Sequence, residues 1–193
     1  MGFFQDLGFG PRAEYYGDAE KTLHLTIQYE GLFDFDGLYA AIIDWAKNYG
    51  FLWHEVDYKH KVPSALGAEQ ELKFLMTKRI DPYVMYQINM HIHIYEMLDV
   101  EVKVGDKIKN LTKASLYVKF FGTVHLDWQK RFKKGGALGK SLGALYKRIY
   151  KHEISGIYWD TLVYRVYNLQ HVVKGYFDMQ SKKYAFKGYI GEH

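Results

Sequence analysis

The chain has 193 residues, an apolar fraction of 48%, an aromatic fraction of 18% and a formal net charge of +4 at pH 7. This length and composition argue against intrinsic disorder and allow a domain with a real core. The sequence has no cysteine, which excludes disulfides, thiolate metal sites and a cysteine nucleophile. No apolar run approaches the ~20 residues that span a bilayer, and we expect a soluble protein of the cytoplasm.

The N-terminal third predicts an irregular arm, a strand and a helix. Residues 1–20 are rich in glycine and aromatic residues and show no period, which indicates the arm. From Thr22 to Glu30 apolar and polar residues alternate, which predicts a strand. A helix is predicted from about 36 to 49, because aspartates precede it as N-cap candidates, apolar residues recur at helical spacing and Gly50 follows as a stop.

A long β region follows the helix. Alternation predicts strands over residues 51–61, 71–80, 83–104 and 113–127. At ~3.3 Å per residue the third run would span roughly 70 Å, which is longer than a small domain can hold straight. We therefore expect a bend near Glu96–Asp99 that divides this run into two strands.

The C-terminal third predicts two helices and a tail. In the first helix, apolar residues share one stripe and basic residues take the opposite side. The stripe comprises Leu138, Leu142, Leu145, Tyr146 and Ile149, and the basic side comprises Lys140, Lys147, Arg148 and Lys151. The second helix is expected from Asp160 to about Met179. Residues 181–193 mix lysine with aromatic residues and predict a loosely held tail.

Three glycines, Gly135, Gly139 and Gly143, repeat every four residues at the start of the basic helix. Each glycine inside a helix costs ~1 kcal/mol relative to alanine, so a compensating reason is expected. One explanation is the close approach of another backbone to this edge. The other is that 133–137 is a loop and that the helix begins only near Leu138.

This order of elements predicts a single α+β domain over residues 1–193. It would contain an antiparallel sheet of about six strands, one helix after the first strand, and two C-terminal helices packed on the sheet. The order resembles the helix-grip folds, in which a curved sheet wraps a C-terminal helix and often encloses an apolar cavity. This likeness concerns topology and carries no functional residue to this chain.

Charge is distributed unevenly along the chain. Residues 1–101 contain 16 acidic and 8 basic side chains, hence −8, whereas residues 102–193 contain 6 acidic and 18 basic ones, hence +12. No acidic residue occurs from Gln129 to His152. The cations of this stretch are the candidate anion-binding residues: Lys130, Arg131, Lys133, Lys134, Lys140, Lys147, Arg148 and Lys151. The split indicates a docking face for an anionic partner, or two lobes that neutralise each other.

Three interpretations of the basic helix stay open. In the first, its basic side is the solvated face of a surface helix. In the second, it binds RNA or a ribonucleoprotein. In the third, the helix lies on an anionic membrane surface. The interleaved aromatic residues Trp128, Phe132, Tyr146 and Tyr150 could stack on unpaired bases or sit among lipid headgroups. We favour a non-catalytic binding protein, with RNA slightly ahead of lipid.

Two further function classes remain. One is a carrier or sensor of an apolar small molecule in a cavity between the sheet and the last helix, which the surplus of aromatic residues and methionines would suit. The other is an assembly subunit whose acidic and basic halves associate between copies. The sequence presents no catalytic set and requires no cofactor. His91 and His93 could share a metal that Asp127 or Glu96 completes, with His125 on the outer face of a predicted neighbouring strand. However, Gln87 and Asn89 continue the same polar stripe, which favours a polar lining of a sheet face or pocket.

Overall fold

The protein folds as α+β, with one antiparallel sheet in the order β1-β5-β4-β3-β2. The computed structural model describes residues 18–64, 67–104, 107–150 and 153–179. The predicted tail at 181–193, and the predicted arm except its last three residues, lie outside these ranges. The five strands are β1 (Asp18–Phe33), β2 (Leu52–Ser64), β3 (Gly67–Arg79), β4 (Val84–Val104) and β5 (Lys107–Leu126).

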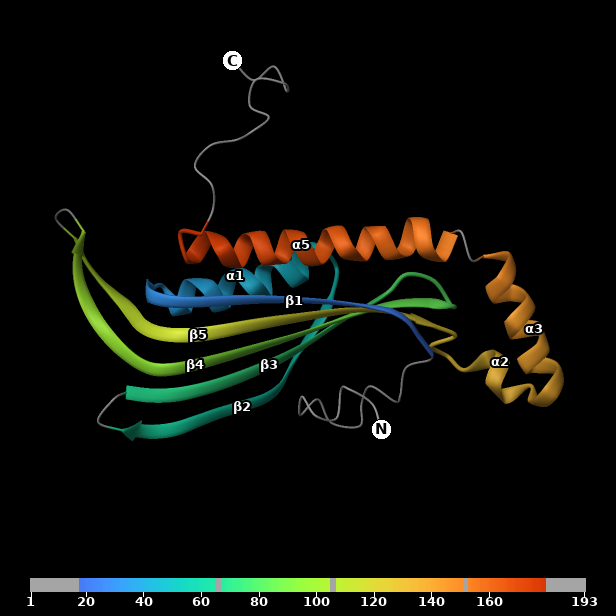
Figure 1. Cartoon of the computed structure of the whole chain (residues 1–193), viewed down its shortest axis with the longest axis horizontal. Coiled ribbons are helices and arrows are strands. Elements are labelled where there is room, and N and C mark those ends of the chain that lie inside the picture. Colours follow the sequence, from blue (N-terminus) through green and yellow to red (C-terminus); the bar gives the residue numbers. More distant parts are fainter. Residues whose placement is uncertain (1–17, 65–66, 105–106, 151–152, 180–193) are drawn as a thin grey trace, which may run out of the picture.

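The sheet has five strands where about six were expected, because β4 is continuous over 21 residues. The bend predicted at 96–99 is present as an irregularity: Glu96 has φ +53°, and the pairing with β5 shifts between Tyr95 and Leu98. Such a bulge bends a strand without ending it. The prediction that this run divides into two strands is therefore wrong. Beyond the irregularity, β4 and β5 curl together away from the rest of the sheet (Figure 1).

Two helices cover one face of the sheet (Figure 1). The helix α1 (Phe35–Asn48) lies where it was predicted, and Asp34 Oδ1 accepts a hydrogen bond of 2.8 Å from the Gly37 amide as its N-cap. The helix α5 (Trp159–Tyr176) is the second predicted C-terminal helix, and a short π-helix, η2 (Ile154–Tyr158), precedes it. The two covering helices are joined by a 2.7 Å hydrogen bond from Trp45 Nε1 to Asn168 Oδ1.

The core lies between these helices and the sheet. Four residues of α5 are completely buried against it: Leu162, Val166, Leu169 and Val173. The helix approaches β5 closely at Gly122, where an added Cβ would lie 2.9 Å from Val166 Cγ2. Alternation places most apolar residues of the strands toward the helices. The polar residues of the strands lie mainly on the other side of the sheet, where Leu75, Met85 and Phe121 are also buried. Side chains of α5 and the sheet are therefore in direct contact.

The remaining helices, α2 (Arg131–Lys134) and α3 (Gly136–Ile149), lie beyond one end of the sheet (Figure 1). The chain turns away from the sheet after β5, with positive φ at Asp127 and Lys130. Of the two helices expected to pack on the sheet, α5 does so, whereas α3 packs on α2 and Tyr83. In the described ranges, no helix is both long and apolar enough to cross a membrane.

Candidate functional site

Asp127 fixes the start of the unit formed by α2 and α3. Its Oδ1 accepts a 2.7 Å hydrogen bond from the Arg131 amide, and its Oδ2 accepts one of 3.1 Å from the Phe132 amide. A carboxylate at this position satisfies amides at the start of a helix. Both oxygens of this acidic side chain are thus engaged by the backbone, at the edge of a segment rich in lysine and arginine.

The glycine repeat is explained by the close approach of Phe132 on α2. A Cβ at Gly139 would collide with the Phe132 carbonyl oxygen, and one at Gly143 would lie 3.0 Å from Phe132 Cβ. A Cβ at Gly135 would lie 3.0 Å from Gly139 Cα. Close backbone approach is therefore the correct explanation of the repeat. The alternative was wrong, because α3 begins at Gly136 and not near Leu138.

The predicted aromatic contacts form an internal cluster. The Tyr146 ring lies 4.7 Å from the Tyr83 ring, 5.6 Å from the Phe132 ring and 4.4 Å from the Tyr150 ring. Desolvation raises the pKa of Tyr146 above its usual 10.0, and the neighbouring Tyr150 adds to the shift. The cluster holds the glycine edge of α3 against α2 and the start of β4.

Trp128 is held by separate contacts. Its Nε1 donates a 2.9 Å hydrogen bond to the Asp81 carbonyl oxygen, and the Arg79 guanidinium lies 4.9 Å from its ring centroid. The four aromatic residues proposed as ligand contacts therefore all make contacts within the protein.

Because the glycine edge faces inward, the apolar stripe of α3 faces water. The exposed fractions are 80% for Leu138, 58% for Leu142, 55% for Leu145 and 66% for Ile149. We call these four residues the leucine stripe. Ile157 in the following η2 is also 60% exposed. Single exposed apolar residues are ordinary, but a contiguous row marks an interaction surface.

The cations of α3 lie away from the leucine stripe. At 100° per residue, Lys140 and Lys147 fall on the side opposite the stripe, and Arg148 falls beside it. All three side chains are exposed, as is Arg131 at the start of α2. Lys130 is half-buried. The structure thus brings these described cations together on one projecting unit. The side chains of Lys133 and Lys134, and all of Lys151, lie outside the described part.

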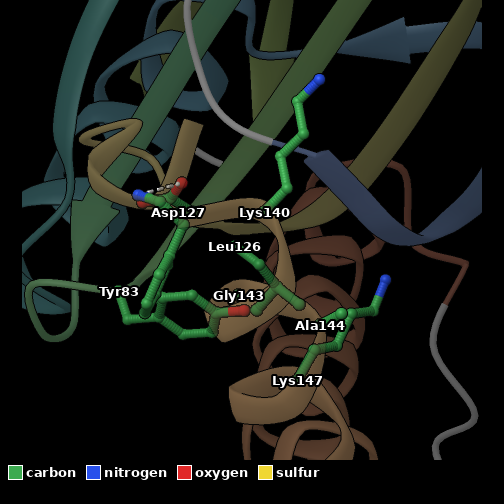
Figure 2. Close-up of a pocket in the computed structure, with 8 residues that line it drawn as sticks. Tyr83, Leu126, Asp127, Lys140, Gly143, Ala144 and Lys147 are labelled. Atoms are coloured by element: carbon green, nitrogen blue, oxygen red, sulfur yellow. Dashed lines mark hydrogen bonds between the residues drawn. The ribbon is translucent and has the colours of Figure 1, made fainter. Parts of the chain in front are cut away.

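A pocket of about 530 Å³ separates α3 from the end of the sheet. Figure 2 shows Lys140 and Lys147 extending from the helix at its edge, with the Tyr83 ring lying beside Gly143. The lining residues are Tyr83, Leu126, Asp127, Phe132, Lys140, Gly143, Ala144 and Lys147. Sequence reasoning missed Tyr83, which follows the Asp81-Pro82 break and shows no local signal for this role.

Three carboxylates of the N-terminal half are engaged on the sheet itself. Asp57, Glu69 and Glu71 pair with Lys59, Lys61 and Lys73 of the same two strands, β2 and β3, at 2.8–3.3 Å. His91 and His93 face the polar side of the sheet and line a pocket there, as the alternation predicts. Within the described ranges, no three His, Asp or Glu side chains are placed to hold a metal ion.

Comparison with known proteins adds no assignment to this geometry. No protein-family model matches the sequence, and no curated protein matches it significantly.

Proposed function

We propose that the chain is a non-catalytic binding protein that docks on an anionic membrane surface through α2 and α3. The observation that carries this proposal is the leucine stripe, which is 55–80% exposed on a helix without an acidic residue. A helix with an apolar side and a cationic side can lie in the headgroup region of a bilayer. Its apolar side chains then leave water, while the cations attract anionic lipids.

The exposed stripe favours lipid over RNA. Lysine and arginine contacts to phosphates would use the cations of α3 but would leave the leucines in water. Full burial of one leucine is worth about 1.5–3 kcal/mol, so a partner that covers the stripe has a large advantage. The aromatic residues that would stack on bases are also packed against one another or against Arg79. RNA binding therefore becomes an alternative outcome of the test.

Charge favours an anionic surface over pairing of two α3 helices. The stripe residues recur with spacings of 4, 3 and 4, which two helices could share as a short seam. However, a second copy would bring a second cationic helix without an acidic residue, with Arg148 of each copy beside the shared stripe. Like charges oppose this association, whereas an anionic surface offers complementary charge.

The direct test is sedimentation with vesicles of phosphatidylcholine that either contain or lack phosphatidylserine. We expect binding to the phosphatidylserine vesicles that weakens as salt is added. The double variant Leu142→Ser/Leu145→Ser should bind about tenfold more weakly or worse, since it removes two leucines that the bilayer would bury. The matched control is Leu52→Ser/Ile108→Ser, because both residues are exposed apolar side chains on strands (61% and 69%), and it should bind as the parent does.

A charge-reversal set distinguishes the outcomes. Lys140→Glu/Lys147→Glu/Arg148→Glu should abolish vesicle binding, whereas Lys103→Glu/Lys109→Glu/Lys113→Glu, with the same net charge change on β4 and β5, should retain it. A filter assay with single-stranded RNA runs in parallel. RNA binding that is lost on charge reversal but unchanged by the leucine variant would overturn the membrane proposal in favour of RNA. Vesicle binding that survives the α3 reversal would reject it outright.

A further inference from the structure

The polar face of the sheet carries two adjacent rows of side chains, each crossing all five strands. Strand pairing aligns the first row as Thr26, Lys119, His91, Lys73 and Asp57, and the second as Gln28, Tyr117, His93, Glu71 and Lys59. Directly opposed side chains on one face lie about 4.5–5.5 Å apart at Cβ, so neighbours in a row interact. These rows are distant from α3 and play no part in the proposed membrane docking.

On the β3 side, the rows are electrostatically balanced. His91 Nε2 lies 2.9 Å from Glu71 Oε1, and His93 Nε2 lies 2.7 Å from Glu69 Oε1. Lys73, only 4% exposed, lies 3.1 Å from Glu71 and 3.3 Å from Asp57. The carboxylates on this side are thus committed to lysine and histidine partners.

On the β5 side, the positive charge of Lys119 is not balanced in the same way. In the part of the chain that the structure describes, no carboxylate is placed against the Lys119 ammonium. Its neighbour Thr26 is uncharged, and its neighbour His91 faces Glu71. Beside it, the Tyr117 hydroxyl accepts a 3.1 Å hydrogen bond from Gln28 Nε2, which leaves the phenol proton to donate elsewhere.

These groups surround a hollow of about 430 Å³, which is within the range of small-molecule sites. It is lined by Thr26, His91, His93, Tyr95, Tyr117 and Lys119. One wall is aromatic: the His93 and Tyr95 rings stack at 4.1 Å, and the Tyr117 ring meets Tyr95 edge-on at 6.2 Å. The hollow therefore combines an ammonium, a hydroxyl donor and flat apolar surface.

We propose that this hollow binds a small organic anion. Its carboxylate or phosphate group would contact the Lys119 ammonium and the Tyr117 hydroxyl, and its carbon part would lie against the rings of Tyr95 and His93. The charge of Lys119 would then acquire the counter-ion that the sheet does not supply. Carboxylate and phosphate share this chemistry, and the experiment separates them.

The experiment follows the imidazole signals of His91 and His93 by NMR while benzoate, phenyl phosphate or benzamide is added. Benzoate, phenyl phosphate or both should cause saturable shifts, and whichever binds more tightly identifies the anionic group. Burial lowers the pKa of His91, and Lys119 contributes to the lowering. A bound anion should therefore raise this pKa, which a ring contact alone would not do. Benzamide has the same ring without the charge and should bind at least about tenfold more weakly.

Two variants locate the site. Lys119→Met should weaken anion binding at least about tenfold, whereas Lys113→Met, on the same strand and face but outside the hollow, should not. Tyr117→Phe removes only the hydroxyl and should also weaken anion binding. This variant tests the site if Lys119→Met does not fold. The proposal is overturned if neither anion gives a saturable shift, if benzamide binds equally well, or if the Lys113 control loses as much affinity as the variants in the hollow.

Discussion

His91 and Glu71 link the stability of the sheet to pH. Burial lowers the pKa of His91 below its usual 6.5. Burial alone would raise the pKa of Glu71, but hydrogen bonds from Lys73 and Lys59 outweigh it and lower the pKa from 4.5 to about 2. In both cases the unfolded chain binds a proton more readily than the folded one does. Acid should therefore destabilise the protein through both residues.

The expected pH profile has two parts. The free energy of unfolding should fall as the pH drops below about 6.5, where unfolded His91 would become charged, and again between 4.5 and about 2, where Glu71 becomes protonated. Urea denaturation over a pH series measures it. His91→Gln should flatten the first part and leave the second. A profile that is unchanged in His91→Gln would contradict the role given to this side chain.

Alternation along the sequence was enough to place His91 and His93 on the polar face of the sheet. Their partners Glu69 and Glu71 could not be predicted, because register determines them. The pairing of β3 with β4 shifts between Ala68 and Gln70, and a shift of one residue would move every opposed side chain. Local sequence does not encode where such a shift falls.

The helices α3 and α5 show the same apolar periodicity and opposite burial. Leu162 on α5 is completely buried beneath the sheet, whereas Leu138 on α3 is 80% exposed. The spacing of leucines predicted both helices, but spacing does not say whether the chain itself supplies a surface to cover them. The side of α3 that faces inward is set by the glycine contacts with Phe132, which depend on the turn after β5.

The two leucines provide a matched test of this difference. Leu162→Ala should lower the free energy of unfolding by about 2–5 kcal/mol, because it leaves a cavity in the core. Leu138→Ala should change it by no more than about 0.5 kcal/mol, since this side chain is 80% exposed and no element in the described part of the chain buries it. Denaturant unfolding monitored by circular dichroism measures both. A large loss in Leu138→Ala would mean that the stripe is covered within the protein.

Local sequence signals predicted the bounds of α1 well, but they predicted the course of β4 less well. The N-cap at Asp34 and the stop at Gly50 bound α1 nearly as predicted, because both act within one turn of the helix. The irregularity at Glu96 was predicted at the right place. The prediction that it ends the strand was wrong, because the partner strand β5 continues past it and pairs with β4 on both sides. Whether a bend ends a strand depends on its neighbour, which local periodicity does not report.

In the whole molecule, the opposite charges of the two halves do not form two lobes. The strand β5, from the basic half, lies between β1 and β4 of the acidic half. The charge split along the chain is therefore mixed within the sheet. The described cations of the acid-free stretch gather instead at the projecting end formed by α2 and α3 (Figure 1).

This arrangement predicts where contact with a membrane would occur. On addition of phosphatidylserine vesicles, backbone amides of α3 should exchange hydrogen more slowly, since docking should order the helix and bury its outer side. Amides at the hairpin end of β2 and β3, in residues 57–61 and 69–73, should be unaffected, because this end of the two strands lies at the opposite end of the sheet from α2 and α3 (Figure 1). Hydrogen exchange with mass spectrometry measures this. Protection centred on β2 and β3 would place the contact elsewhere.

The leucine stripe also bears on colloidal behaviour in the absence of any partner. At low ionic strength, the cations of α3 keep neighbouring molecules apart. Added electrolyte shortens the range of this repulsion but leaves the attraction between apolar surfaces intact. The protein should therefore be most soluble in dilute buffer and should precipitate reversibly as kosmotropic salt accumulates.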